Sequence, residues 1–292
     1  MNCYYLYITI MSSLLILFFF LIIILIIKAN SKNKYNCDNE NMTIIENPTI
    51  VENPINKHFN KIYVICIPSR KEYITNVMEH MGIYPTYVDA ILASSLPSLN
   101  ILMENKIINE KFLMRFLGDE YKNILEEHEE KVFIGIKGKI ALHLTLIYTM
   151  RLFLESNEEK CLVFEDDILK PPDLNVLFSR FKNIFENEIK NDYNMINLGR
   201  CYDDCSNNKK YSENLVSNTR AMCTHAMIYD RKVANVIINS LPLYGGGDYV
   251  VAEAVASDKN LIYYSTTPPL FFQNNSELGS TLNNTTSMWE CI

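Results

Sequence analysis

Residues 135–173, GIKGKIALHLTLIYTMRLFLESNEEKCLVFEDDILKPPD, decide the fold of this 292-residue chain. Their first half predicts a helix, because apolar side chains recur three and four positions apart at Ile140, Leu144, Ile147, Met150 and Leu154. A polar break over 156–160 ends this helix, and the apolar run 161–164 that follows is typical of a strand buried on both faces. The stretch therefore predicts one helix-to-strand step of an α/β domain.

Three adjacent carboxylates, Glu165, Asp166 and Asp167, directly follow this predicted strand. Ligands of open α/β sheets bind outside the carboxyl ends of the strands, so these acids are expected at the mouth of a site. Adjacent acids repel one another unless water or a cation neutralises them, and Mg²⁺ or Mn²⁺ bridged to a diphosphate would do so. We predict Asp167 and Glu165 as the metal ligands. The alternatives are that these acids form a solvated loop, or that Asp167 only caps a short helix at Ile168.

The first 28 residues differ from the rest of the chain. The apolar, uncharged run 3–27 exceeds the roughly 20 residues that cross a bilayer, with no basic segment before it and no small-residue cleavage site after it. We therefore predict a retained transmembrane anchor over 1–28. Residues 29–58 are polar, Asn-rich and without periodicity, which predicts a flexible linker. The remainder, 59–292, suits one α/β domain.

Two features of the sequence give opposite orientations for this anchor. Basic residues follow the span and none precedes it, which favours a cytoplasmic body; they are Lys28, Lys32 and Lys34. Glycosylation sequons favour a lumenal body instead, and they begin at Asn41, Asn274, Asn283 and Asn284.

The domain opens with a strand, a helix and a second strand, which predict a parallel βαβ unit at 61–70, 71–81 and 84–90. Pro68 and Arg70 lie in the first strand-to-helix turn, where nucleotide-binding folds place a phosphate or a base. Asp89 lies at the end of the second strand. The chain has no Gly-x-Gly-x-x-Gly or phosphate-loop sequence, which counts against a dinucleotide or ATP fold. Its net charge of −7 counts against nucleic acid as a partner.

The second half of the chain continues the alternation, which predicts a single, mostly parallel sheet. Strands are predicted at 193–199, 226–229 and 261–264, and helices at 174–189, 231–241 and 250–256.

A run of three glycines, Gly245 to Gly247, precedes Asp248 in this half. Glycines remove side-chain bulk and let a ligand approach the backbone, so an acid beside them is placed to activate a hydroxyl as a general base. We predict Asp248 as this base and Glu253, one turn further along, as the fallback. The alternative is that Asp248 only caps the helix that follows.

Three cysteines, Cys201, Cys205 and Cys223, bracket a polar loop. They could be zinc ligands, although His225 is the only nearby residue to complete a set of four. We prefer a disulfide from Cys223 to one of the other two, formed in an oxidising compartment. Reduced, buried thiols are the remaining possibility.

Four segments of the chain together resemble glycosyltransferase family 25, whose members include lipopolysaccharide and collagen galactosyltransferases. The segments are the strand 64–70 ending in arginine, the pattern 135–143 that keeps Gly135, Gly138 and His143, the acids 165–167, and the element 264–273 with Pro268-Pro269-Leu270 and Gln273. The resemblance runs from about Lys61 to Ser280. Ile136, Lys139 and Leu142 stand where the family has glutamate, cysteine and serine.

The resemblance implies a GT-A-like nucleotide-binding fold and transfer of a hexose, galactose or glucose, from a UDP-sugar to a glycan or glycoprotein acceptor. It implies Mn²⁺ (or Mg²⁺) and inversion at the anomeric carbon, and therefore a general base on the far face of the sugar. On this basis, the predicted nucleotide-sugar contacts are Pro68, Arg70, Asp89, Glu165 and Asp166. His143 is a third candidate base, although its place midway along an amphipathic helix favours a packed histidine. A transferase of this kind would have a lumenal body of the endoplasmic reticulum or Golgi type.

Two other classes of protein share parts of this pattern. A metal-dependent phosphate-ester hydrolase would use the same acids, but further His or Asp ligands at metal spacing do not accompany them. A catalytically inactive, membrane-anchored glycan-binding or envelope protein could keep the fold, and the substitutions near His143 leave this alternative open.

Overall fold

The structure of the chain is a computed structural model. It describes residues 53–128, 133–189, 192–203, 206, 208–217, 222–274, 278 and 290–291. Two compact units divide the chain, 1–50 and 51–292, and the described residues all belong to the second. The predicted anchor (1–28) and most of the predicted linker (29–52 of 29–58) lie outside the described residues. Of the helices in the described part, none has the length and apolar character that crossing a membrane requires.

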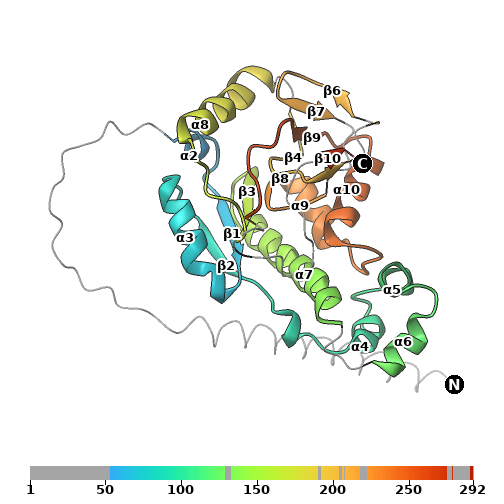
Figure 1. The fold of residues 1–292 in the computed structure, drawn as a ribbon. Helices are drawn as coiled ribbons and strands as arrows, with labels where there is room; N and C mark the ends of the chain where they lie inside the picture. The colour runs from blue at the N-terminus through green and yellow to red at the C-terminus, as the bar shows by residue number, and fades with distance from the viewer. Residues whose placement is uncertain are drawn as a thin grey trace, which may run out of the picture. The chain divides into compact units, whose positions relative to one another are not determined.

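An eight-stranded sheet forms the centre of the described unit (Figure 1). In spatial order its strands are β2 (Thr86–Asp89), β1 (Ile62–Cys66), β3 (Lys160–Glu165), β8 (Ala226–Asp230), β4 (Met195–Asn197), β9 (Tyr263–Thr266), β7 (Leu215–Ser217) and β6 (Lys209–Lys210). A separate parallel pair joins β5 (Tyr202–Asp203) to β10 (Glu290–Cys291). The α/β class predicted from the alternation of elements is confirmed.

The sheet is mixed, which corrects the prediction of a mostly parallel sheet. The parallel pairs are β1 with β2, β1 with β3, and β4 with β9. Strand β8 lies between β3 and β4 and is antiparallel to both, and β7 and β6 add two further antiparallel pairs. The apolar run that forms β8 specifies burial on both faces, but it does not specify the direction in which the strand enters the sheet.

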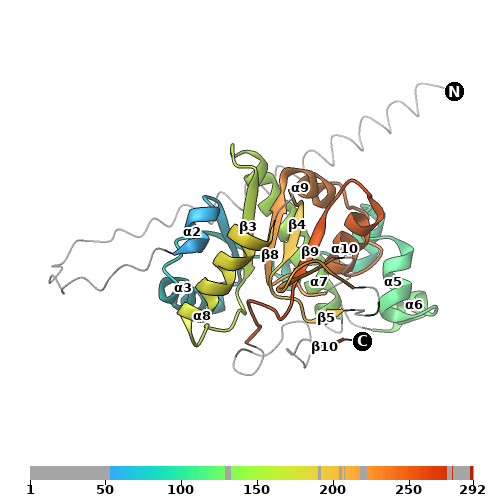
Figure 2. The same ribbon diagram turned by 90° about the horizontal axis from the view of Figure 1, so that it is seen from above.

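Helices cover both faces of the sheet (Figures 1 and 2). One face packs on α2 (Pro54–His58), α3 (Lys71–His80) and α8 (Leu174–Lys182). The other packs on α7 (Ile134–Leu154), α9 (Arg231–Ile238) and α10 (Gly247–Ser257). Alternate residues of β1 serve the two cores: Val64 and Cys66 belong to the first, and Tyr63 and Ile65 to the second. This division follows from the two-residue period of a strand.

Short helices build a third apolar cluster beside the start of α7. They are α4 (Leu99–Glu104), α5 (Glu110–Leu117) and α6 (Tyr121–Glu127), which pack around Phe112 and Leu113. The remaining helical segments are the 3₁₀ turns η1 (Pro68–Arg70) and η2 (Ala93–Ser95) and the π-helical segment η4 (Asn183–Glu188).

The body begins earlier than the predicted boundary at residue 59. Asn53 caps α2 and also donates a hydrogen bond from Nδ2 to the Met81 carbonyl oxygen at 2.6 Å. Pro54 and Ile55 are buried against the sheet. Residues 53–58, which lack the periodicity of a long helix, are therefore part of the packed unit and not of a flexible linker.

The stretch that predicts the fold has the predicted local structure. Helix α7 runs from Ile134 to Leu154, and β3 follows from Lys160 to Glu165. Its residues 161–164 are all buried, as the uninterrupted apolar run indicates. The acids therefore leave the sheet at the carboxyl end of a central strand.

Candidate active site

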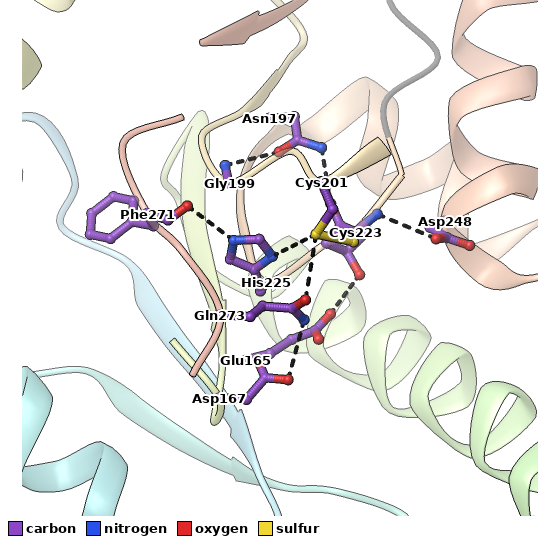
Figure 3. The surroundings of a disulfide bond; sticks show 11 residues. Glu165, Asp167, Asn197, Gly199, Cys201, Cys223, His225, Asp248, Phe271 and Gln273 are labelled. Carbon is purple, nitrogen blue, oxygen red and sulfur yellow. Dashed lines mark hydrogen bonds between the residues drawn. A yellow bond between two sulfur atoms is a disulfide. The ribbon is translucent and has the colours of Figure 1, made fainter. Parts of the chain in front are cut away.

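The antiparallel direction of β8 determines which residues meet the acids. Because β8 runs against β3, the residues before β8 lie beside the residues that end β3. Phe164 pairs with Ala226, and the Glu165 amide donates to the His225 carbonyl oxygen at 3.0 Å. The carboxyl ends of β1, β2, β3, β4 and β9 share this edge, since all five strands run the same way. Figure 3 shows the side chains that gather there.

Asp166 forms a buried ion pair with Arg70. The Arg70 Nη1 to Asp166 Oδ1 distance is 3.1 Å, and the Ile67 amide donates to Asp166 Oδ2 at 2.7 Å. Burial raises the pKa of Asp166, although the Ile67 amide and the Arg70 guanidinium act in the opposite direction. Arg70 also donates to the Leu278 carbonyl oxygen at 3.3 Å. This pair joins the first βα turn to the end of β3, as the prediction that both belong to one site requires.

Asp167 faces Gln273 and keeps one oxygen available. Gln273 Nε2 donates to Asp167 Oδ2 at 3.2 Å, and Arg70 Nη1 lies 4.0 Å from the same oxygen. The Asn274 amide donates to the Asp167 carbonyl oxygen at 2.6 Å. Asp167 Oδ1 is buried and has no hydrogen-bond partner among the described residues. Burial raises the pKa of Asp167, whereas Arg70 and Gln273 counteract this effect.

Within the described part of the chain, the hydrogen-bond partners of Glu165 are neutral groups. The Thr224 hydroxyl donates to Glu165 Oε1 at 2.5 Å. Burial, followed by the charge of Asp167, raises the pKa of Glu165 to about 8, and Asp166 and Asp248 add to the shift. Electrostatically, Glu165, Asp167 and Asp248 therefore form one acidic group.

Asp248 is the second residue of α10, and it does not cap that helix. The N-cap is Gly246, and Asp248 Oδ1 accepts from the adjacent Tyr249 amide at 2.8 Å. The Cys223 amide donates to Asp248 Oδ2 at 3.3 Å (Figure 3). A helix N-terminus favours a negative charge at this position. Asp248 therefore lies next to the turn that also holds Glu165.

The glycine run before Asp248 is filled by side chains of the protein itself, which corrects the interpretation of an open floor for an acceptor. A Cβ atom at Gly247 would lie 2.5 Å from His143 Nδ1, and one at Gly245 would lie 2.9 Å from the Tyr249 ring. At Gly246 the nearest atom would be Asp248 Oδ1, at 2.8 Å. Of the three, Gly247 lets α10 approach His143 of α7 closely.

His143 is a packed histidine on α7. It is 1 % exposed, and its Nε2 lies 2.6 Å from the Ser240 hydroxyl. Burial lowers the pKa of His143 to about 4, so the ring is neutral at physiological pH. A general base must reach the hydroxyl that it deprotonates, and this ring is enclosed against Gly247. His143 therefore positions the start of α10, and the sequence-based suggestion of a catalytic role finds no support in its surroundings.

The two remaining predicted residues lie apart from the acidic group. Glu253 Oε2 accepts from the Tyr244 hydroxyl at 2.9 Å, and five helical positions rotate it by about 140° from Asp248. Asp89 is exposed at the end of β2, where it pairs in register with Cys66. Pro68 is exposed in η1, next to Arg70.

Glu165 and Asp167 have the donor chemistry of a site for a hard divalent cation. Carboxylates are the ligands that Mg²⁺ and Mn²⁺ prefer, and Asp167 Oδ1 is a buried acceptor without a donor. A cation bound there would also oppose the repulsion that raises the pKa of Glu165. The alternative of a fully solvated acidic loop is wrong, because Asp166 is 8 % exposed and Asp167 Oδ1 is buried.

A disulfide joins Cys201 to Cys223, with a Cα–Cα distance of 5.7 Å. The preferred pairing of Cys223 with one of the two upstream cysteines is therefore confirmed, and Cys205 lies outside the described residues. Asn197 at the end of β4 donates to the Cys223 carbonyl oxygen at 2.9 Å and accepts from the Gly199 amide at 3.0 Å. Together, the bridge and Asn197 hold the Cys223–Thr224 turn against the acids (Figure 3).

Sequence patterns alone did not identify Thr224 or the Cys223 amide as site residues. Neither carries a motif, because their role arises from the direction of β8. Gln273 did have a signal, its place in the Pro-Pro-Leu-x-x-Gln element, although its contact with Asp167 was not foreseen.

Comparison with known proteins leaves the family open. No family model matches the sequence, and no curated protein matches it either. Among solved structures, the crystal structure of apo UDP-glucose pyrophosphorylase matches with a TM-score of 0.37 and 10% identity, over 70% of this chain and 89% of that one. A likeness of this size carries no argument about function. The resemblance to glycosyltransferase family 25 stays a prediction.

Proposed function

We propose that this protein is a metal-dependent, inverting glycosyltransferase that transfers a hexose from a UDP-sugar to a glycan or glycoprotein acceptor. The observation that supports it best is the meeting of Glu165, Asp167 and Asp248 at one edge of the sheet. Three carboxylates from two distant segments share an enclosed site, and the Cys223–Thr224 turn contacts two of them. Carboxylates held together in this way repel one another and destabilise the fold unless a bound ligand offsets their charge.

Each side of the site has a distinct role in this proposal. Arg70, at the first βα turn, offers a guanidinium next to Asp166 and suits the nucleotide side. Glu165 and Asp167 would hold Mn²⁺ or Mg²⁺, which when bound offsets the negative charge of the leaving diphosphate.

Asp248 would take the proton from the acceptor hydroxyl. Two backbone amides, from Cys223 and Tyr249, donate to its carboxylate oxygens and hold the side chain at the start of α10. One base is sufficient for inversion, because the acceptor attacks from the face opposite the leaving diphosphate.

Asp167→Asn tests the metal and donor side. The variant keeps the shape of the side chain and removes the charge beside the unpartnered oxygen, so Mn²⁺-dependent UDP-sugar binding should be lost while the melting temperature changes by only a few degrees. Titration of the full-length protein with UDP-sugars, with and without Mn²⁺, measures this. Asp119→Asn, an exposed aspartate on another surface, is the charge-matched control and should bind as the wild type does.

The outcome also separates the other classes of protein. Unchanged nucleotide affinity in Asp167→Asn would refute the proposed donor site. Glycan binding without turnover of any UDP-sugar would favour an inactive binding protein, and release of phosphate from simple esters would favour a hydrolase.

A further inference from the structure

The disulfide lies in a cluster of three side chains that can bind metal. The Sγ atoms of Cys201 and Cys223 and a ring nitrogen of His225 all lie within 4.8 Å of one another. Cys201 and His225 are each 1 % exposed, whereas Cys223 is partly exposed. Its members come from the loop after β4 and the turn before β8 (Figure 3).

The ring of His225 is oriented as in a metal ligand. Its Nε2 lies 3.1 Å from the Phe271 carbonyl oxygen, and because a carbonyl only accepts, the proton is on Nε2. The lone pair is therefore on Nδ1, which faces Cys201 Sγ at 4.0 Å. Histidines that bind metals donate their second ring N–H to a carbonyl or carboxylate in this way.

The backbone also fixes this orientation. A Cβ atom at Gly199 would lie 2.2 Å from His225 Nε2, so the ring occupies space that only a glycine leaves open. The ring therefore packs directly on the loop after β4.

We propose that Cys201, Cys223 and His225 form a zinc site when the disulfide is reduced. Zinc bonds of about 2.3 Å to sulfur and 2.0 Å to nitrogen, at a tetrahedral angle, place those two atoms about 3.5 Å apart. The observed 4.0 Å from Cys201 Sγ to His225 Nδ1 is close to this spacing, whereas the two sulfur atoms must move apart from bonding distance once the disulfide is reduced. Gln273 Oε1 lies 3.4 Å from Cys201 Sγ.

The disulfide is converted to the zinc site in two steps. A dithiol or phosphine reductant supplies two electrons, the sulfur–sulfur bond breaks, and two protons complete the two thiols. Zinc then displaces these protons, so the bound form carries two thiolates and a neutral imidazole.

This site differs in chemistry from the carboxylates beside it. Thiolate and imidazole ligands select zinc, whereas Glu165 and Asp167 suit Mg²⁺ or Mn²⁺. The proposed zinc site is independent of the proposed sugar transfer. Its test measures metal binding by the two cysteines and does not measure turnover.

The test uses the full-length protein, reduced with a phosphine that is then removed, and Co²⁺ as a spectroscopic substitute for zinc. We expect one equivalent of Co²⁺ to produce a thiolate-to-metal charge-transfer band, which zinc then removes by displacement. His225→Gln should weaken Co²⁺ binding at least tenfold. Cys66→Ala, which removes a buried free thiol elsewhere in the sheet, should leave it unchanged.

A second measurement needs no variant. Zinc should protect Cys201 and Cys223 of the reduced wild-type protein from alkylation, as located by mass mapping of peptides. Equal alkylation of both with and without zinc, or a Co²⁺ band that His225→Gln leaves at full affinity, would overturn the proposal.

Discussion

The two sides of the acidic turn after β3 differ in what neutralises them. On one side, Asp166 has a guanidinium at 3.1 Å and a backbone amide at 2.7 Å. On the other, Glu165 and Asp248 have a hydroxyl and backbone amides as their partners in the described part of the chain. Neighbouring carboxylates in one motif therefore have different surroundings: Asp166 is paired within the framework of the fold, whereas the described partners of Glu165 are neutral.

This difference also explains why burial alone does not identify a functional acid. Burial raises the pKa of both Asp166 and Glu165, but for Asp166 the Ile67 amide and Arg70 oppose the shift. Around Glu165 the nearest charges are other carboxylates, which increase it. Under the proposed function, a divalent cation held by Glu165 and Asp167 would offset this repulsion.

If the side with Glu165 and Asp248 carries the chemistry, Asp248→Asn should produce the largest effect, a loss of turnover. The amide cannot take a proton, so turnover of the full-length protein should fall by a factor of about 10²–10⁴ while UDP-sugar binding stays near that of the wild type. Steady-state transfer assays measure this. Glu253→Gln, on the same helix but held by Tyr244, is the matched control. Loss of turnover in the control alone would move the base to Glu253.

Asp166→Ala should be the most destabilising change on the paired side. It leaves the Arg70 guanidinium buried and without its closest carboxylate, which typically costs about 3–5 kcal/mol in the free energy of unfolding. Asp167 Oδ2 lies 4.0 Å from Arg70 Nη1 and remains in this variant, so we expect a loss near the lower end of this range.

Denaturant unfolding measures this loss. Asp192→Ala removes an exposed partner of Lys160, 2.8 Å away, and should cost at most about 1 kcal/mol. Equal losses in the two variants would contradict the assignment of Asp166 to the framework.

Glu165→Gln should produce a smaller change of opposite sign. Because the pKa of Glu165 is raised to about 8, the folded protein holds this proton more tightly than the unfolded chain does. The resulting stabilisation is complete below the unfolded pKa and is lost as the pH rises toward about 8. The glutamine variant does not ionise, so without divalent cations it should be more stable than the wild type at neutral pH, and the gain should vanish near pH 4.

Glu188→Gln provides the opposite-sign control for this measurement. Burial alone would raise the pKa of Glu188, but hydrogen bonds from Ser212 and Asn214 outweigh this effect and lower it. Its ionised form therefore stabilises the fold above the usual glutamate pKa, and the stabilisation is lost as the pH falls. Glu188→Gln should be less stable than the wild type at neutral pH. If both variants shifted in the same direction, the distinction between them would be wrong.

Predictions made from local patterns agree well with the structure. The three- and four-residue spacing of α7, the apolar run of β3 and the acids at its end are all where the sequence indicates. The predictions that differ depend on packing at a distance. The glycine run before Asp248 was interpreted as open space, and His143, from a helix a hundred residues away in sequence, fills part of it.

The sequence by itself determined the elements and the chemistry of this protein: an α/β order, an enclosed strand ending in three carboxylates, and a cysteine beside a histidine before β8. The tertiary structure decided which of these residues meet. The reversed direction of β8 brings Thr224 to Glu165 and the Cys223 amide to Asp248, and the loop after β4 brings Cys201 to Cys223. The physical reason is the distance in sequence over which each property is set. Side-chain periodicity reports whether a segment is buried, whereas the direction and neighbours of a buried strand depend on contacts with segments distant in the chain.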